Sequence, residues 1–414
     1  MKRIVVVGAG FGGMWAALAA ARLLDIHGVP AAEAEVVVIA PEPALHVRPR
    51  FYEDDPAAMA APLLPLFRET GIGYVRGTVD AIDTDARRVA FVGGDGRRET
   101  LGYDRLVLAS GSRLHRPDIP GLADFAFSID QLAEAVALDG HLRALPLRPD
   151  DEARNTVVVI GGGFTGIEIA AELPGRLRRI LGAGACVRIV ILERADAIGP
   201  ELGPGPRPVI ERALRELGVE VRLGASAARI DADGVVTAAG ERIAAGTVVW
   251  TAGLRASPLA RQIPGDKDPL GRIVVDRDLR APAAPCVFVA GDAGRAATDD
   301  AGNHTLMSCQ HALLLGRSAG NNAAADLLGL ATIPYAQPRY GTTLDLGPWG
   351  AVRCEGWERV VQMAGPEVKP MKRMINSKLI YPPPADRRAA FEAADPVVDV
   401  EKLKRRVAEL LAAE

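Results

Sequence analysis

The amino-acid sequence predicts an α/β protein built from two similar strand–turn–helix units and a smaller C-terminal α+β unit. In both units an apolar run leads into a turn with the spacing Gly-x-Gly-x-x-Gly and then into a helix-forming segment. The first turn holds Gly8, Gly10 and Gly13, and the second holds Gly161, Gly163 and Gly166. From Ile333 onward the chain is more aromatic and basic, which sets a third unit apart.

The glycine spacing predicts that each turn binds a dinucleotide. The first glycine allows a tight turn, the second lets backbone N–H groups approach a diphosphate, and the third lets the helix pack against the strand. The diphosphate would lie at the positive end of that helix. Because a simple turn without a ligand explains two matching sets poorly, we expect two Rossmann-like domains.

Composition restricts the class of protein. The chain has 414 residues, of which 49% are apolar and 24% charged, and its net charge is −3. This balance argues against nucleic acid as a partner, which would require clustered positive charge. The cysteines form no CxxC pair, so their spacing predicts neither a zinc site nor a dithiol, and a reducing, cytoplasmic compartment is expected.

The N-terminus superficially resembles an export signal, because Lys2 and Arg3 precede an uncharged run at residues 4–21. The glycine turn inside this run decides against export, since cleavage would remove a phosphate site. Residues 157–173 contain two glutamates and are not expected to span a membrane.

The first unit continues with a helix at residues 11–24 and a strand at residues 35–40. An acidic residue that binds the adenosine ribose is expected at the end of this strand, about 20 residues after the turn. The nearest carboxylate is Glu42, which is either that ribose ligand or an exposed loop residue.

Residues 41–65 are rich in proline and predict a long, ordered loop, and such loops are often functional in compact domains. Strands are expected at residues 74–83 and 87–92. A buried strand then ends in small residues that include Ala109 and Gly111.

The second unit follows a helix at residues 128–144 and a polar linker at residues 146–155. Its second strand, residues 187–192, ends at Glu193, where a ribose-binding acid belongs. Glu193 would accept hydrogen bonds from both ribose hydroxyls and repel a 2′-phosphate, which favours NADH over NADPH. Its neighbour Arg194 weakens this preference, because a basic side chain can admit the phosphate.

Beyond this unit a buried segment ends at Gly253, and a later strand is terminated by Gly291 and Asp292. Further expected elements are helices at residues 207–217 and 308–328 and strands at residues 220–223, 228–231 and 286–290.

The two turns about 150 residues apart, the small residues at 109–111 and the FVAGDA segment together resemble the pyridine nucleotide-disulfide oxidoreductase superfamily of two-dinucleotide-binding flavoproteins. The resemblance implies a discontinuous FAD domain at residues 1–117 and 268–330. An NAD(P)H domain at residues 118–267 would be inserted into it, and residues 331–414 would form a C-terminal domain that faces an interface or a membrane.

The resemblance also implies where the ligands bind. The first glycine turn would bind the diphosphate of FAD, held without a covalent bond, and Ala109 and Gly111 would line the same site. Gly291 would meet the ribityl and phosphate part of FAD, and Asp292 would accept hydrogen bonds from the ribityl hydroxyls. The alternative for Asp292 is a carboxylate that caps the following helix. The second turn and Gly253 would bind NADH.

The cysteine positions exclude the members of this superfamily that use a dithiol or a single redox cysteine. No cysteine precedes Cys186, so none follows the first glycine turn closely. Sulfide:quinone oxidoreductases need two well-placed cysteines, and only Cys309 and Cys354 could meet. Cys309 is better explained as a small buried residue at the beginning of a helix.

Within the superfamily the sequence most resembles the type II NADH dehydrogenases, which are single-chain NADH:quinone oxidoreductases. The similarity lies in GGGFTGIEIAAEL, in VVWTAGL and in the helix after GDA. It implies hydride transfer from NADH to the flavin and then transfer of two electrons to a quinone-like or other small acceptor. Glu168 matches the family glutamate beside nicotinamide and flavin, and its alternative is a carboxylate that stabilises a helix N-terminus. Gln310 matches the first glutamine of the family's AQxAxQ pattern, on a helix that points at the flavin.

One position departs from the family. The second glutamine, which the family uses near the quinone, is Leu314 here. His311 either contacts the acceptor or is structural. The departure leaves two other functions open: a soluble NAD(P)H-dependent reductase for a redox protein or a specialised metabolite, and an NADH-sensing flavoprotein that binds a partner.

The C-terminal region is the candidate for membrane contact. Residues 369–381 carry four basic and no acidic residues among hydrophobic ones, and residues 398–411 place Leu403 and Val407 on one face with Lys402 nearby. Such patterns can bind an anionic membrane surface, but a short helix folded onto the protein explains them equally well. The expected location is therefore the cytoplasm, with peripheral contact at the cytoplasmic face of the membrane and a homodimer as open alternatives.

Overall fold

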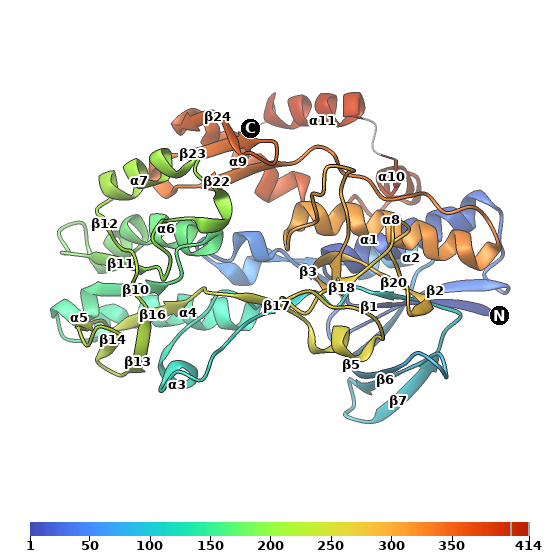
Figure 1. Ribbon diagram of the computed structural model, residues 1–414, viewed down its shortest axis with the longest axis horizontal. Coiled ribbons are helices and arrows are strands. Elements are labelled where there is room, and N and C mark those ends of the chain that lie inside the picture. The colour runs from blue at the N-terminus through green and yellow to red at the C-terminus, as the bar shows by residue number, and fades with distance from the viewer. Residues whose placement is uncertain (398–399, 413–414) are drawn as a thin grey trace.

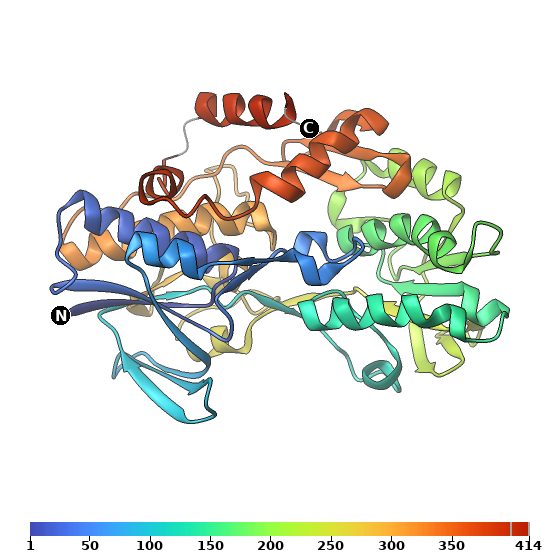
Figure 2. The ribbon, with the colours of Figure 1, turned by 180° about the vertical axis from the view of Figure 1, so that it is seen from behind.

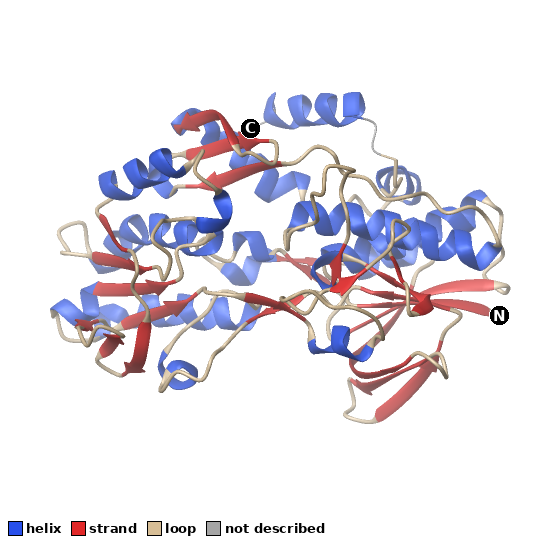
Figure 3. Ribbon diagram, viewed as in Figure 1, coloured by secondary structure: helices blue, strands red, loops and turns tan. Residues whose placement is uncertain are grey.

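The computed structural model describes the backbone of residues 1–397 and 400–412, and the side chains of residues 1–397 and 405–411. It has an α/β fold in which two sheets lie side by side and the C-terminal part of the chain lies over one side of both (Figure 1). Figure 2 shows the same three parts from behind, and Figure 3 distinguishes the strands from the helices around them.

The first sheet has eight strands in the order β19-β20-β8-β1-β2-β5-β6-β7. Its centre is parallel, whereas β6, β7 and β19 are antiparallel. Valine and isoleucine dominate the central strands because both faces are covered, and Ile4, Val5 and Val6 are fully buried. The strands are β1 (Lys2–Val7), β2 (Ala34–Ala40), β5 (Gly73–Asp83), β6 (Arg88–Gly93), β7 (Arg98–Gly102), β8 (Arg105–Leu108), β19 (Arg280–Ala281) and β20 (Ala284–Val289).

Two helices that are far apart in the sequence pack against each other beside this sheet: α1 (Phe11–Ile26) and α8 (Cys309–Leu328). A Cβ atom added at Gly320 would overlap the backbone carbonyl of Ala16. Small residues therefore let the two helix backbones touch, and this contact fixes α8 relative to the first glycine turn.

The second sheet has four parallel strands in the order β12-β11-β10-β16. A small antiparallel sheet, β13-β14-β15, and three helices pack around it. The elements are β10 (Thr156–Ile160), β11 (Arg188–Leu192), β12 (Val219–Arg222), β13 (Ala227–Asp231), β14 (Gly234–Thr237), β15 (Arg242–Ala244), β16 (Thr247–Trp250), α4 (Leu132–Ala144), α6 (Phe164–Leu181) and α7 (Arg207–Glu216).

Two predictions about this region were wrong in detail. The helix α4 begins at Leu132 rather than at residue 128, because the Ser128 hydroxyl accepts a hydrogen bond from Asp130 N at 3.0 Å and holds an irregular turn. The polar linker contains a helical turn, α5 (Glu152–Asn155), since Asp151 caps its N-terminus.

The chain passes between the two sheets through a pair of antiparallel strands, β9 (Ser112–Leu114) and β17 (Leu254–Ala256). The first follows β8 and the second follows β16, so both crossings leave from the carboxyl ends of parallel strands. Ligands bind at these ends in open α/β sheets. The domain limits given above stay a prediction.

The C-terminal part begins with an antiparallel sheet, β22-β23-β24, and ends with short helices. After β22, a Cβ atom added at Gly347 would overlap the carbonyl of Ala171 in α6, so this glycine brings the C-terminal sheet against the second Rossmann-like unit. Among the described residues, every helix is too short or too polar to cross a bilayer. The elements are β22 (Gly341–Asp345), β23 (Ala351–Glu355), β24 (Val360–Gly365), α9 (Lys369–Met374), a π-helical turn (Ile375–Leu379), α10 (Arg387–Ala393) and α11 (Val400–Ala412).

The remaining elements are short. The loop predicted at residues 41–65 is ordered and contains an antiparallel strand pair and two 3-10 turns before the next helix. The short elements are β3 (Ala44–His46), β4 (Ala60–Pro62), α2 (Leu64–Thr70), α3 (Leu122–Phe125), β18 (Ile273–Val274) and β21 (Gly294–Arg295).

Candidate functional site

One cleft with a volume of about 2520 Å³ runs along the carboxyl ends of both sheets and beneath the C-terminal part. Both glycine turns line it, together with the beginning of α8. Sites for a single small ligand measure roughly 300–1,000 Å³, so this cleft has room for more than one ligand.

The first glycine turn closes against the neighbouring strand end. Gly8 has a φ of +108°, and a Cβ atom there would lie 2.5 Å from the carbonyl oxygen of Ala109. At Gly13, a Cβ atom would overlap the carbonyl of Gly8, whereas nothing lies within 4 Å of the Cβ position of Gly10. Gly10 therefore leaves open space in front of the α1 N-terminus, as a diphosphate requires.

Small residues extend this part of the cleft. Ala109 and Gly111, which has a φ of +66°, both line the cleft. Between them, the hydroxyl of Ser110 also lines the cleft and is buried without a hydrogen-bond partner among the described residues. Buried polar atoms are rarely left unpaired, so this hydroxyl is available to hydrogen-bond with a ligand in the cleft.

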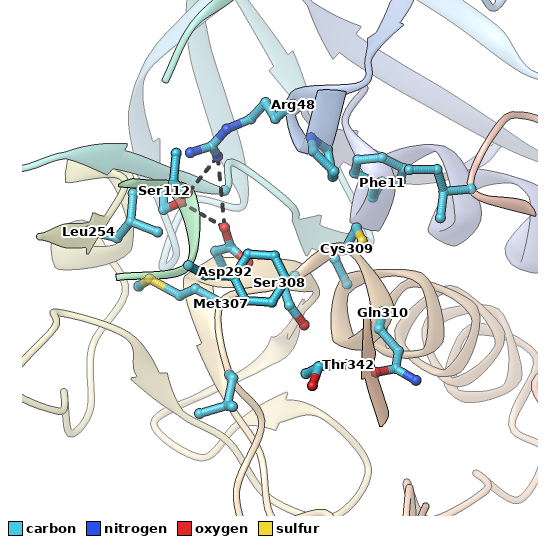
Figure 4. Close-up of a pocket in the computed structure, with 18 of the residues that line it drawn as sticks. Phe11, Arg48, Ser112, Leu254, Asp292, Met307, Ser308, Cys309, Gln310 and Thr342 are labelled. Atoms are coloured by element: carbon cyan, nitrogen blue, oxygen red, sulfur yellow. Dashed lines mark hydrogen bonds and ion pairs between the residues drawn. The ribbon is translucent and has the colours of Figure 1, made fainter. Parts of the chain in front are cut away.

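Asp292 faces the cleft beside Arg48 and Ser112, which come from two other segments of the chain (Figure 4). Its Oδ2 accepts a hydrogen bond of 2.6 Å from the Ser112 hydroxyl and lies 3.8 Å from Arg48 Nη1. Arg48 also pairs with Asp130. The Ser308 hydroxyl caps α8, so Asp292 is not the cap of that helix. Gly291 gives the preceding backbone a φ of +66°.

Glu42 lies on an exposed bend after β2 and lines the cleft. Its Oε2 is 3.0 Å from His46 Nε2. The structure therefore places it within reach of a ligand at the first glycine turn, and its role as a ribose ligand stays a prediction.

The second glycine turn repeats the geometry of the first. Gly161 has a φ of +111°, and a Cβ atom at Gly166 would overlap its carbonyl oxygen. Gly253 follows β16 with a φ of +78° and accepts a hydrogen bond of 2.7 Å from His115 N. Gly161, Gly163 and Gly253 line the cleft, whereas Gly166 packs the helix against the turn behind it.

Glu193 stands at the end of β11, as predicted. Its Oε2 accepts a hydrogen bond of 2.6 Å from Gly162 N and its Oε1 accepts one of 2.7 Å from Ala195 N. Because a carboxylate has about four acceptor positions, both oxygens can still accept from ribose hydroxyls.

A second carboxylate, which the sequence did not single out, lies at the N-terminus of α6. Glu201 Oε1 accepts a hydrogen bond of 2.7 Å from Phe164 N, and a Cβ atom at Gly163 would lie 2.5 Å from the same oxygen. The space expected for a diphosphate in front of Gly163 is therefore occupied by a negatively charged side chain.

Glu168 is buried between α6 and the C-terminal part, where only 3% of its surface is exposed. Its Oε1 lies 2.8 Å from Lys372 Nζ and accepts a hydrogen bond of 3.1 Å from Asp345 N. Burial raises the pKa of Glu168 to about 7, and the positive charge of Lys372 opposes this rise. The side chain lines the cleft and is not a helix-terminal carboxylate.

A buried polar network continues from this pair through Asp345, Tyr52 and Asn376. Asp345 accepts a hydrogen bond of 2.9 Å from the Tyr52 hydroxyl and also pairs with Lys369. The Tyr52 hydroxyl in turn accepts a hydrogen bond of 3.1 Å from Asn376 Nδ2. The 41–65 loop and α9 thus meet at Glu168, and burial together with nearby carboxylates raises the pKa of Tyr52.

The N-terminus of α8 points into the cleft through Cys309 and Gln310, and Leu314 lines the cleft one turn later. His311 is fully buried and does not line the cleft, which fits the structural alternative. Desolvation raises the pKa of the Cys309 thiol to about 11, so it stays protonated at neutral pH. Cys309 and Cys354 are both free thiols.

The basic stretch at residues 369–381 does not present all its charges outward. Lys369 and Lys372 turn inward to Asp345 and Glu168, whereas Arg373 is exposed. In the stretch predicted at residues 398–411, Val398 and Asp399 lie outside the described backbone, and Lys402, Leu403 and Lys404 lie outside the described side chains.

Comparison with known proteins shows the family of the chain. Residues 2–316 match the family model described as pyridine nucleotide-disulphide oxidoreductase. An NADH dehydrogenase-like protein of Mycobacterium tuberculosis strain CDC 1551 is 46% identical over 396 residues, which cover 95% of this chain and 98% of that protein.

Two further proteins are similar. A type II NADH:quinone oxidoreductase, NdhA, of Mycobacterium tuberculosis strain H37Rv is 31% identical over 319 residues, covering 70% of this chain and 66% of that protein. The structure of NDH2 from Plasmodium falciparum in complex with NADH superposes with a TM-score of 0.75 at 12% identity, covering 95% of this chain and 97% of that one, and so shares its fold. The chain belongs to the pyridine nucleotide-disulphide oxidoreductase family, is close to the type II NADH dehydrogenases within it, and is an oxidoreductase enzyme.

Proposed function

We propose that this protein is an FAD-dependent NADH dehydrogenase that passes two electrons to a quinone-like or other small acceptor. The observation that supports this function most is the single cleft lined by both glycine turns, with Glu168 and the α8 N-terminus also lining it. Two dinucleotides bound at these turns would approach each other end to end in this cleft.

The residues around the first glycine turn fit FAD. Gly8 and Gly13 keep the turn tight, Ser110 offers an unpaired hydroxyl, and Asp292 presents a carboxylate toward the cleft. When bound, FAD would take the hydride of NADH and hand two electrons onward. The protein would orient it with backbone N–H groups of α1 and α8, whose partial positive charge favours negative charge nearby.

The second glycine turn fits NADH, with Glu193 accepting from the ribose hydroxyls. A 2′-phosphate would lie beside this carboxylate, which favours NADH, while Arg194 lines the same part of the cleft and leaves NADPH as a second donor.

The position of Glu201 leads to a prediction about the affinity for NADH. Replacing Glu201 by glutamine is expected to lower the KM for NADH roughly threefold, because an exposed carboxylate that repels the diphosphate is removed. The measurement is the initial rate against NADH concentration at low and high salt, and the difference between variant and wild type should shrink at high salt.

Replacement of Glu193 should change the KM for NADH in the opposite direction. Replacing Glu193 by alanine removes hydrogen-bond acceptors for the ribose and should raise the KM for NADH about tenfold, with flavin content unchanged. A rise in KM for Glu201→Gln as well would mean that Glu201 helps to bind NADH rather than opposing its diphosphate.

The residues at the beginning of α8 support a quinone-like electron acceptor. Gln310 and Leu314 line the cleft at the beginning of α8, next to the site proposed for the flavin ring. A leucine in place of a glutamine removes a hydrogen-bond donor from this wall, so a quinone here would be held by shape and apolar contact.

An anaerobic mixing experiment tests the function. NADH should bleach the flavin absorbance quickly, and a short-chain quinone should restore it far faster than oxygen does. Failure of quinones alongside a fast protein acceptor would overturn quinone reduction in favour of a soluble reductase, and slow recovery with every acceptor would favour an NADH sensor.

We assign the enzyme to the cytoplasm, with peripheral contact at the membrane through the C-terminal part. The exposed Arg373 supports such contact, whereas Lys369 and Lys372 do not contribute because they pair inside. Flotation with vesicles that contain anionic lipid tests this contact, and Arg373→Gln should weaken it.

A further inference from the structure

Arg359 is a buried cation that the proposed chemistry does not use. It ends the turn between β23 and β24 with a φ of +54°, and the residue is only 6% exposed. Among the described residues, no carboxylate lies within 4 Å of its guanidinium, and no group accepts a hydrogen bond from it; Nη1 is fully buried without a partner. Buried charges are normally paired, yet the described part of the chain supplies no counter-ion to this arginine.

Aromatic rings hold the guanidinium in place. Its Cζ lies 4.2 Å from the centre of the Tyr340 ring. Tyr340 stacks on His311 at 4.8 Å and on Trp357 at 5.0 Å between ring centres. A cation over an aromatic face is stabilised, but the ring accepts none of the in-plane N–H bonds of an arginine.

Two more nitrogens in the same stack lack a partner. His311 Nε2 and Trp357 Nε1 are both buried and unpaired among the described residues. Burial and the positive charges of Arg359 and Arg272 lower the pKa of His311 to about 3, so its ring is neutral. Arg272 differs from Arg359 because its Nε pairs with Asp268 at 2.7 Å.

Arg359 and the aromatic ring below it border the cleft. Arg359 and Tyr340 are both among the lining residues. A Cβ atom added at Gly205 would lie 2.5 Å from the carbonyl oxygen of Arg359, so the turn touches the loop that follows Glu201. The Arg359 backbone thus touches the second Rossmann-like unit, while its guanidinium lies on Tyr340 beside His311 in the first turn of α8.

We propose that Arg359, held on Tyr340, forms an anion-binding subsite of the cleft that takes a phosphate, sulfonate or carboxylate group of an entering small molecule. The source of the anion is either the diphosphate of the dinucleotide or a negatively charged electron acceptor. This proposal rests on the proposed function, because that function names the dinucleotide and the electron acceptor as the two sources of the anion. An oxyanion would supply the in-plane acceptors that the guanidinium lacks.

Kinetics of the holoenzyme distinguish the two sources. Arg359→Gln is compared with wild type in two assays: the KM for NADH with menadione as a neutral acceptor, and the KM for a sulfonated naphthoquinone as an anionic acceptor at saturating NADH. Loss of a charge-assisted pair should raise one of these values about tenfold. A rise in the KM for NADH with menadione assigns the dinucleotide diphosphate, and a rise in the KM for the sulfonated naphthoquinone alone assigns the acceptor.

Two further variants separate binding from structure. Arg359→Lys keeps the charge but not the planar set of N–H donors, so it should restore part of the lost affinity. Arg353→Gln is the matched control, since the Arg353 charge is already balanced by Glu355 at 3.3 Å. Arg353→Gln should leave both KM values unchanged. If Arg359→Gln lowers only the melting temperature and leaves both values unchanged, the subsite does not exist and Arg359 is purely structural.

A binding measurement covers the case in which the protein oxidises no NADH. Inorganic pyrophosphate should then still raise the melting temperature of wild type more than that of Arg359→Gln. The absence of NADH oxidation would overturn the proposed function, whereas the larger rise in wild type would still support the subsite. An equal rise in both proteins would overturn the subsite.

Discussion

Replacing Asp292 by alanine is expected to yield protein that lacks most of its flavin. Asp292 Oδ2 already accepts from Ser112, and the carboxylate faces the cleft with room for further donors. Two charge-assisted hydrogen bonds from ribityl hydroxyls would together stabilise the bound flavin by about 3 kcal/mol, so their loss should weaken binding about 100-fold. The measurement is the ratio of flavin absorbance to protein after purification and dialysis.

Two controls make this expectation specific. Asp292→Asn keeps the size of the side chain and one acceptor, so it should retain an intermediate amount of flavin. Asp326→Ala removes a carboxylate on α8 that pairs with Arg105 and Arg280, away from the cleft, and should lower stability without loss of flavin. Fully yellow, active Asp292→Ala protein would refute the ribityl role.

The parts of this site that depend on short-range sequence could be predicted. Each glycine turn, the strand before it and the helix after it lie within one short segment, and the acid at the end of β11 follows from the same pattern. The positions of Gly8, Gly161 and Glu193 were therefore accessible before the structure, because local backbone geometry requires glycine at two of them and strand polarity places the third.

The parts that depend on long-range packing could not be predicted. Lys372 was interpreted within a basic, membrane-facing stretch, yet it lies against Glu168 some 200 residues earlier in the chain. The one local signal was the spacing of Lys369 and Lys372, which share a helix face with neighbouring apolar residues. Glu201 gave no signal, since it reaches the α6 N-terminus only because a loop folds back beside β11.

The pair of Glu168 and Lys372 gives the second large effect. Reduction of a quinone to a quinol consumes two protons, and Glu168 is a buried carboxyl in the cleft whose pKa is raised to about 7. Glu168→Gln should therefore lower the rate at which quinone restores the flavin absorbance by about 100-fold, at the low end of what general acid catalysis contributes. Bleaching by NADH should slow far less, because hydride transfer needs no side-chain acid.

The pH profile shows whether Glu168 itself donates the proton. In wild type the quinone step should slow as pH rises through about 7, because the protonated fraction of Glu168 falls there. This inflection should be absent in Glu168→Gln. Lys372→Met removes the charge that lowers the Glu168 pKa, so its inflection should move to higher pH. Asp345, whose negative charge raises the same pKa, provides the opposite case: Asp345→Asn should move the inflection to lower pH. Identical profiles in all four proteins would place the proton donor elsewhere and leave the buried pair with a structural role, in which it joins the C-terminal part to α6.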